Sequence, residues 1–191
     1  MIGLFLGDKK LPIEILEKIK KKNVKYFIID LSKNNKFKKN KNSYSISIGK
    51  FGKILELIHS KKCKRVLFAG NINKPKISKL DLDFKGIYYI PRIIKAAKLG
   101  DAAILKELIK ILYENKIKVI KLNKFNPELT LKKGIFTKTR PSKFDIKYIK
   151  NGIDILNKTN SYNHTQALII RENKVISFEK QNGTQKMIKS I

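Results

Sequence analysis

Short apolar runs alternate with longer amphipathic stretches along most of the chain. Runs typical of strands lie at residues 1–6, 24–31, 44–48, 65–69 and 118–122. Apolar residues at helical spacing lie at residues 13–22, 51–60, 93–99 and 101–115. Repeated strand and helix units of this length predict an α/β fold, in which a Rossmann-like open parallel sheet carries helices on both faces.

The periodic pattern stops after residue 126. Residues 127–144 contain Gly134, Pro141 and several Lys and Thr residues but no sustained period. This change of character places a domain boundary there. We therefore predict a Rossmann-like domain at residues 1–126, followed by a second, smaller α/β domain at residues 127–191.

The second domain is expected to be incomplete. Its pattern predicts a helix at 145–156, strands at 166–170 and 175–178 joined by a tight turn, and a helix that begins at 183. One helix and one hairpin bury little apolar surface by themselves. The domain must either pack on the first domain or continue beyond the given residues.

Cysteine content and apolar run lengths exclude several classes of protein. Cys63 is the only cysteine among the 191 residues, so the chain forms no internal disulfide and no zinc site of the paired-cysteine kind. No apolar run approaches the roughly twenty residues of a membrane span, and Met1 follows no basic leader. We expect a protein of the reducing cytoplasm that does not cross a bilayer.

The formal charge of +29 has a compositional explanation. The chain holds 40 Lys but only 4 Arg, together with 31 Ile and 16 Asn, and Lys, Ile and Asn are the residues of AT-rich codons. Arg is the side chain that base edges and phosphates favour. We therefore interpret the charge as lysine spread over solvated faces, which attracts anionic lipid or a diphosphate without specific nucleic-acid recognition.

Four turns follow predicted strands, where open parallel sheets bind ligands. They are residues 7–8, 30–31, 49–52 and 70–75. At the first turn a strand meets Gly7 and then a helix that opens at Pro12, and this geometry leaves backbone N–H groups for a phosphate. Gly3 and Gly7 lack the third glycine of a dinucleotide fingerprint, so an NAD site is disfavoured even with Asp30 near a ribose position.

Few side chains are suited to acid–base or metal chemistry. His59 ends a lysine-flanked helix and His164 lies in a polar loop, so both are expected to be solvated. Four carboxylates remain as candidates, namely Asp81, Asp83, Asp101 and Glu179. The alternative roles are a helix cap for Asp101 and an ordinary strand-end charge for Glu179.

The separate turns form an ordered series that resembles a known family. The first half reads Gly3, Gly7, Leu11-Pro12, Gly49 to Leu55, Ala69 to Pro75, Leu80-Asp81, Asp83 and Gly100 to Leu105. The second half continues with Gly134 to Thr137, Pro141-Ser142, Asp145-Ile146, Gly152, Gln166-Ala167, Glu179, Gly183-Thr184 and Met187. In order and spacing this series resembles the LpxI-type UDP-2,3-diacylglucosamine pyrophosphatases.

The resemblance implies an enzyme of lipid A synthesis with two α/β domains that hold substrate between them. The implied reaction is attack of water on the α-phosphate of UDP-2,3-diacylglucosamine with the help of a divalent metal, Mg or Mn, which would yield UMP and 2,3-diacylglucosamine 1-phosphate (lipid X). The implied location is the cytoplasm, peripheral to the inner face of the cytoplasmic membrane and in contact with its lipid. The resemblance leaves open whether the protein forms a homodimer.

The resemblance also implies roles for individual residues. Asp101 and Glu179 are the catalytic candidates, and Asp81 and Asp83 are the candidate metal ligands. The main catalytic aspartate is expected in an acidic tail after Ile191. The implied substrate-binding residues are Gly7, Leu11, Pro12, Gly49, Gly52, Lys53, Ala69, Gly70, Asn71, Lys74, Pro75, Thr137, Pro141, Ser142, Gln166, Gly183 and Thr184.

The sequence also departs from the family pattern. Thr165 stands where the family has Gly, and Asn182 and Gln185 stand where it has acids. An amide brings no charge and cannot act as a base, which weakens metal binding at that loop. We expect the chain to be the front part of a longer enzyme and inactive alone.

Two further functions stay open. One is a UDP-sugar-binding module without catalysis, which UDP would stabilise without product formation. The other is a basic nucleic-acid-binding domain, whose binding would weaken steeply with salt.

Overall fold

The computed structural model describes residues 1–72, 79–132, 134–159, 165–180 and 183–191, without the side chain of Asp101. These residues form two compact units, which are described separately. The first comprises Met1–Lys95 and Leu105–Leu131, and the second comprises Ala96–Ile104 and Lys132–Ile191. No helix among the described residues is both long enough and apolar enough to span a membrane.

The first unit is built on a sheet of five parallel strands in the order β3-β2-β1-β4-β5. The strands are β1 (Ile2–Leu6), β2 (Tyr26–Asp30), β3 (Ser43–Ser45), β4 (Arg65–Ala69) and β5 (Lys118–Val119). The helices are α1 (Leu11–Lys21), α2 (Phe51–Ser60), α3 (Phe84–Ala97), α4 (Asp101–Glu114) and α5 (Leu122–Phe125), followed by the 3-10 turn η2 (Pro127–Leu129). The predicted Rossmann-like open sheet is confirmed.

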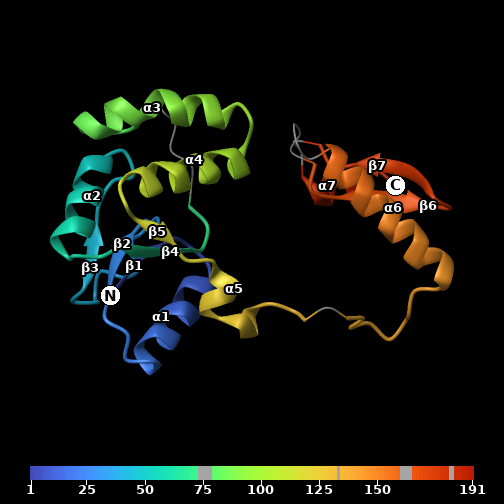
Figure 1. Cartoon of the computed structure of the whole chain (residues 1–191), viewed down its shortest axis with the longest axis horizontal. Helices are drawn as coiled ribbons and strands as arrows, with labels where there is room; N and C mark the ends of the chain where they lie inside the picture. Colours follow the sequence, from blue (N-terminus) through green and yellow to red (C-terminus); the bar gives the residue numbers. More distant parts are fainter. Residues whose placement is uncertain (73–78, 133, 160–164, 181–182) are drawn as a thin grey trace. The chain divides into compact units, whose positions relative to one another are not determined.

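Helices cover both faces of this sheet because its strands are apolar on both faces. In β1, Ile2, Leu4 and Leu6 pack toward α1, and Phe5 packs toward α2 and α4. Figure 1 shows α1 and α5 on one side of the sheet and α2, α3 and α4 on the other. The result is a three-layer sandwich in which the carboxyl ends of all five strands lie at one edge.

The second unit has a small core. It contains α6 (Lys143–Thr159), the antiparallel hairpin of β6 (Leu168–Arg171) and β7 (Lys174–Phe178), and the short α7 (Thr184–Lys189). The predicted hairpin is confirmed, and its turn places Glu172 and Asn173 at positive φ, 50° and 63°. Within residues 132–191 the buried residues that the structure describes are Gly152, Thr165 and Met187.

Most bounds shift by a few residues, and three elements of the first unit differ notably from the sequence prediction. α3 begins at Phe84, nine residues before the predicted start at 93, although Gly86 and Pro91 are poor helix formers. β3 ends at Ser45 rather than 48, and β5 ends at Val119 because residues 122–125 form α5. In α3, tertiary contacts such as the Tyr89–Phe51 packing outweigh local propensity.

Candidate functional site

The strand order reverses between β1 and β4, which makes their carboxyl ends the switch point of the sheet. β2 and β3 follow on one side of β1, and β5 follows on the other side of β4. Leu6 pairs with Ala69 at the end of these two strands, so the turns that begin at Gly7 and Gly70 lie next to each other. Open α/β sheets bind ligands at such a point.

The prediction of free backbone N–H groups at Gly7 is wrong. The Gly7 N–H donates to the Ala69 carbonyl at 2.9 Å. The Asp8 N–H donates to the Asn71 carbonyl at 2.7 Å, and the Asn71 N–H donates back to the Asp8 carbonyl at 3.1 Å. Asp8 and Asn71 therefore form a short antiparallel bridge just after the parallel pairing of β1 with β4, and the Gly7 amide that the sequence had assigned to a phosphate is already bonded.

Glycine is required in these turns because backbones meet there. A Cβ on Gly7 would lie 2.2 Å from the Asn71 carbonyl oxygen. Gly70 has φ +91°, and a Cβ on it would lie 2.4 Å from Pro12 Cγ. The structure thus brings the predicted substrate-binding residues Gly7, Pro12, Gly70 and Asn71 into one packed corner, beside Leu11 at the start of α1. Lys74 and Pro75 lie outside the described residues.

A second corner joins the start of α2 to the start of α3. A Cβ on Gly49 would lie 2.5 Å from the Asp81 carbonyl oxygen, and a Cβ on Gly86 would lie 2.2 Å from the Gly49 carbonyl oxygen. Asp81 also forms an ion pair with Lys50 at 2.6 Å. The predicted residues Gly49, Gly52, Lys53, Asp81 and Asp83 all belong to this corner.

The Asp83 carboxylate caps two helices at once. Its Oδ1 accepts the N–H groups of Gly52 at 3.0 Å and Gly86 at 2.8 Å, and its Oδ2 accepts the N–H of Lys53 at 2.9 Å. Gly52 and Lys53 are in the first turn of α2, which has no side-chain cap of its own at Lys50. Asp83 therefore ties the turn after β3 to the segment that leads into α3.

The same contacts keep Asp83 ionised. Burial of the carboxyl opposes ionisation, but the hydrogen bonds from Gly52, Gly86 and Lys53, with the charge of Lys50, outweigh it and lower the pKa of Asp83. A carboxylate with three backbone donors has little remaining capacity for a metal ion. Among the residues described, no three His, Cys, Asp or Glu side chains gather where they would hold one. The described part of the chain does not fit a metal site of its own.

Asp30 is occupied in the same manner at the end of β2. Its buried carboxylate accepts the N–H and the hydroxyl of Ser32, at 3.0 and 2.6 Å, and the N–H of Phe37 at 2.9 Å. These bonds fold residues 32–42 back onto the sheet, where Phe37 is buried. A carboxylate that shapes a loop is not free to bind a ribose.

A hollow of about 320 Å³ lies at the carboxyl edge, beyond the ends of β2 and β3. Its polar groups include the hydroxyls of Ser32, Ser45 and Ser47, the amide of Asn35 and the ammonium group of Lys79, and its apolar walls come from Leu31, Ile46, Ile48, Ile72 and Leu80. None of these was named as a site residue from the sequence, although Leu31 and Ile72 lie in predicted turns and Leu80 belongs to the family series. The signal was present, because the turns after the second and third strands were predicted to face this edge.

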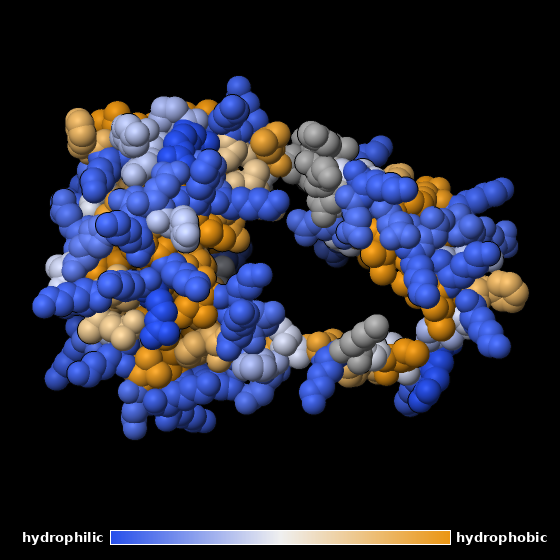
Figure 2. Space-filling model, in the orientation of Figure 1, coloured by the Kyte–Doolittle hydropathy of each residue, from blue (hydrophilic) through white to orange (hydrophobic). Residues whose placement is uncertain are grey.

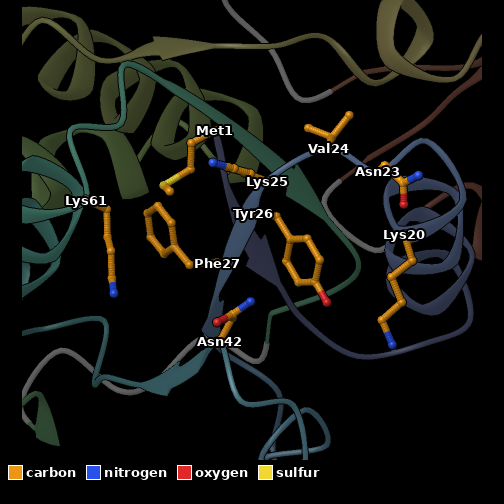
Figure 3. Close-up of a pocket in the computed structure, with 9 residues that line it drawn as sticks. All are labelled: Met1, Lys20, Asn23, Val24, Lys25, Tyr26, Phe27, Asn42 and Lys61. Carbon is orange, nitrogen blue, oxygen red and sulfur yellow. The ribbon is translucent and has the colours of Figure 1, made fainter.

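A larger hollow, about 590 Å³, lies at the opposite edge of the sheet. Figure 3 shows it at the amino ends of β1 and β2, where the lysines Lys20, Lys25 and Lys61 surround the rings of Tyr26 and Phe27. Parallel sheets bind ligands at the carboxyl edge, where the connecting turns converge. The smaller hollow is therefore the better candidate for a ligand site.

The second unit gathers another group of predicted residues around Glu179. Its carboxylate accepts the Thr184 hydroxyl at 2.6 Å and the Gln166 N–H at 2.9 Å. The hydrogen bond from Thr184, followed by that from Gln166, lowers the pKa of Glu179. Gly183, at φ +83°, is the N-cap residue of α7 and directly precedes Thr184. A carboxylate held ionised in this way is a weak general base.

Two departures from the family pattern lie near this group. Thr165 is buried and donates its hydroxyl to the Glu179 carbonyl at 3.0 Å, so the side chain that replaces Gly stabilises the same corner. Gln185 is exposed in α7, and Asn182 lies outside the described residues. The corner around Glu179 therefore holds together without those two acids.

The other predicted residues of the second unit have local roles. Ser142 and Asp145 form a capping box at the start of α6, in which the Ser142 N–H and hydroxyl each donate to Asp145 at 2.8 Å. The backbone bond and then the hydroxyl bond from Ser142 lower the pKa of Asp145. Thr137 donates its hydroxyl to the Thr139 carbonyl, and Pro141 precedes the cap. Asp101 begins α4.

A sheet in the order β3-β2-β1-β4-β5 with glycine-built turns at its switch point defines a Rossmann-like α/β protein. Comparison with known families is more specific. The sequence matches the LpxI N-terminal domain over residues 1–129 and the LpxI C-terminal domain over residues 132–191. The chain belongs to the LpxI family.

One curated relative is the UDP-2,3-diacylglucosamine pyrophosphatase LpxI of Caulobacter vibrioides. It is 28% identical over 146 residues, which cover 76% of this chain and 52% of the relative. The chain therefore spans about half the length of the curated relative that it matches.

Proposed function

We propose that this protein acts in lipid A biosynthesis and that, within the whole enzyme, it serves hydrolysis of UDP-2,3-diacylglucosamine to UMP and 2,3-diacylglucosamine 1-phosphate. The observation that carries this proposal is that both domains of one family match in order along the chain. The curated relative that the chain matches is named for a pyrophosphatase of this substrate.

In this proposal the carboxyl-edge hollow holds the uridine diphosphate group. The hydroxyls of Ser45 and Ser47 and the amide of Asn35 supply the donors and acceptors that ribose and uracil require. The ammonium group of Lys79 supplies a charge for the diphosphate. Ile46 and Ile72 exclude water from one side of the hollow. The work of these residues is to bind and orient the nucleotide.

A divalent metal, Mg or Mn, remains part of the proposal for the whole enzyme. A bound metal would polarise the diphosphate and offset the charge that develops on it. The carboxylates of Asp81 and Asp83 already contact Lys50 and three backbone N–H groups. We therefore assign no step of the reaction to a metal held by these residues.

The lipid substrate suggests where the protein works. We propose a cytoplasmic location with peripheral contact to the inner face of the membrane, since the diacylglucosamine part of the substrate is a lipid. Assembly as a homodimer is proposed as the alternative to a monomer.

The first test is calorimetric titration of the 191-residue chain with UDP. The Lys79→Gln variant should bind UDP about tenfold more weakly, because a charge-assisted contact to phosphate is lost. The matched Lys25→Gln variant removes a lysine from the amino-edge hollow and should bind UDP as the wild type does. No binding of UDP by the wild type, or the opposite ranking of the two variants, would overturn the site proposed.

Catalysis needs a separate test on the lipid substrate. UMP release from UDP-2,3-diacylglucosamine is followed with the chain and with its full-length form, with and without a chelator. Release that a chelator abolishes would support metal-assisted hydrolysis. Turnover that persists in excess chelator would remove the metal from the proposal.

One structural observation favours a second function, a UDP-sugar-binding module without catalysis. The carboxylates of Asp83 and Glu179 are engaged in hydrogen bonds that hold turns together. Thermal stabilisation by UDP without product from either form of the protein would establish this module.

A further inference from the structure

The outer face of α3 is unusually apolar for a solvent-facing surface. Phe84, Ile87, Tyr88 and Ile94 are 88%, 59%, 69% and 38% exposed. With the exposed Pro91 they recur at helical spacing, so they form one stripe along the helix. Figure 2 shows hydrophobic residues exposed among hydrophilic ones along the edge where Figure 1 places α3.

The opposite side of α3 is fixed by its own contacts. Tyr89 packs edge-on against Phe51 with ring centroids 5.5 Å apart, and its hydroxyl accepts a hydrogen bond from Asn115 at 3.1 Å. Arg92 binds Glu107 at 2.6 Å and Glu114 at 2.8 Å. The helix cannot rotate to bury the outer stripe without breaking these contacts, so the stripe faces outward as a consequence of the fold.

The charged residues of α3 itself all have one sign. Lys85 and Lys95 are exposed on α3, and the sequence of the helix contains no acidic residue. Arg92 is already paired with two glutamates, so the free charge at the outer face comes from the lysines. Lysine side chains can extend along an apolar surface while their ammonium groups reach lipid phosphates.

We propose that the outer face of α3 is the surface by which this protein lies on an anionic phospholipid membrane. Phe84, Ile87, Tyr88 and Ile94 enter the boundary between headgroups and acyl chains, and Lys85 and Lys95 contact lipid phosphates. The proposal deepens the proposed function, because a protein that acts on a lipid substrate gains from contact with the membrane that holds it. The surface itself is identified from the exposure and charge of its side chains, without reference to the proposed reaction.

The absence of tryptophan from the sequence gives a clean test. Phe84→Trp places a single fluorophore on the stripe, and Ile13→Trp places one at a half-exposed apolar position on α1, on the other side of the sheet. Each variant is mixed with vesicles of equal parts phosphatidylcholine and phosphatidylglycerol, and separately with pure phosphatidylcholine. Emission is recorded together with quenching by brominated acyl chains.

We expect Trp emission of the Phe84→Trp variant to shift to the blue and to be quenched by brominated lipid in the anionic vesicles only. The Ile13→Trp variant should stay solvent-exposed throughout. In co-sedimentation, Phe84→Ser with Tyr88→Ser should lower the membrane partition coefficient at least about tenfold. Lys85→Gln with Lys95→Gln should lower it more than the matched Lys20→Gln with Lys21→Gln on α1.

Three results would overturn the proposal. The first is equal quenching of Trp emission at positions 84 and 13. The second is Trp emission from position 84 that is already blue-shifted before lipid is added. The third is Trp emission that changes with protein concentration. The second would mean that another part of the chain covers the stripe, and the third would mean that a second copy does. Because the vesicles contain no uridine nucleotide, any of these results would leave the UDP titration and the proposed function untouched.

Discussion

Asp83 links two elements through one side chain. Because its carboxylate accepts N–H groups from the starts of α2 and α3, its removal leaves three backbone donors without that partner. We expect Asp83→Ala to lower the free energy of unfolding by about 2 kcal/mol at neutral pH. Chemical denaturation followed by circular dichroism measures the difference. Asp81→Ala, which removes only a partly exposed ion pair, should cost less than about 1 kcal/mol.

The stability contribution of Asp83 should depend on pH with a defined sign. Its pKa is lower in the folded protein than the ordinary value of 3.8, so the folded state favours the ionised form. The contribution is complete above about pH 4 and is lost as the pH falls through the lower folded value. The difference between wild type and Asp83→Ala should therefore shrink in acid. A difference that grows below pH 4 would contradict this assignment.

Substitutions at Gly70 and Gly183 distinguish the stability cost of a steric clash from that of backbone strain. Both have positive φ, +91° and +83°, but a Cβ at Gly70 would meet Pro12 at 2.4 Å and a Cβ at Gly183 would meet no atom within 4 Å among the described residues. Gly70→Ala should cost about 3 kcal/mol or more, and Gly183→Ala about 1 kcal/mol. Thermal melts of both variants provide the comparison, with Gly134→Ala as a control that changes stability by less than about 0.5 kcal/mol. Equal costs at positions 70 and 183 would refute the packed corner.

At the scale of elements, α3 is held against α4 by Arg92. The hydrogen bonds to Glu114 and then to Glu107 raise the pKa of Arg92, so the guanidinium is charged at any accessible pH. Arg92→Met keeps the length of the side chain but removes these bonds, and should destabilise α3 by about 1 kcal/mol since the pair is partly exposed. Hydrogen exchange of the α3 amides should accelerate about fivefold. Lys106→Met, on the exposed side of α4, serves as the control and should leave α3 exchange unchanged.

Elements with strong periodic patterns could be predicted, and elements stabilised by distant residues could not. α2 and β4 begin and end at the predicted residues, because their apolar residues alone specify them. α3 was predicted from apolar spacing at 93–99, whereas it begins at Phe84 and its first half contains the poor helix formers Gly86 and Pro91. That half is stabilised by the Asp83 cap and by packing of Tyr89 on Phe51, and no local window of sequence contains both.

At the scale of the whole molecule, the charge of +29 predicts attraction to any polyanion without selectivity. Binding to duplex DNA should be weak, independent of base sequence and largely lost by about 0.2 M salt. Fluorescence anisotropy with two unrelated duplexes over a salt series tests this. Tight binding to one duplex that survives that salt concentration would instead support the nucleic-acid-binding alternative.

The candidate site was predictable in position but not in detail. The sequence located the turns at 7–8, 49–52 and 70–75 by their place after strands, and the described parts of these turns lie at the carboxyl edge. It assigned the Gly7 N–H to a ligand, whereas the amide binds the Ala69 carbonyl. Which donors remain free depends on pairing between strands about sixty residues apart, and only the folded chain decides it.

By itself the sequence determined the fold class and the order of its main elements. These follow from apolar periodicity and from the positions of Gly and Pro, which are local properties of the chain. The family was indicated by the resemblance of its ordered motifs to a known family. The tertiary structure alone decided what the carboxylates do and which apolar residues face water. Asp83 became a double cap and Phe84 an exposed residue because hydrogen bonds and packing join segments that are distant along the chain.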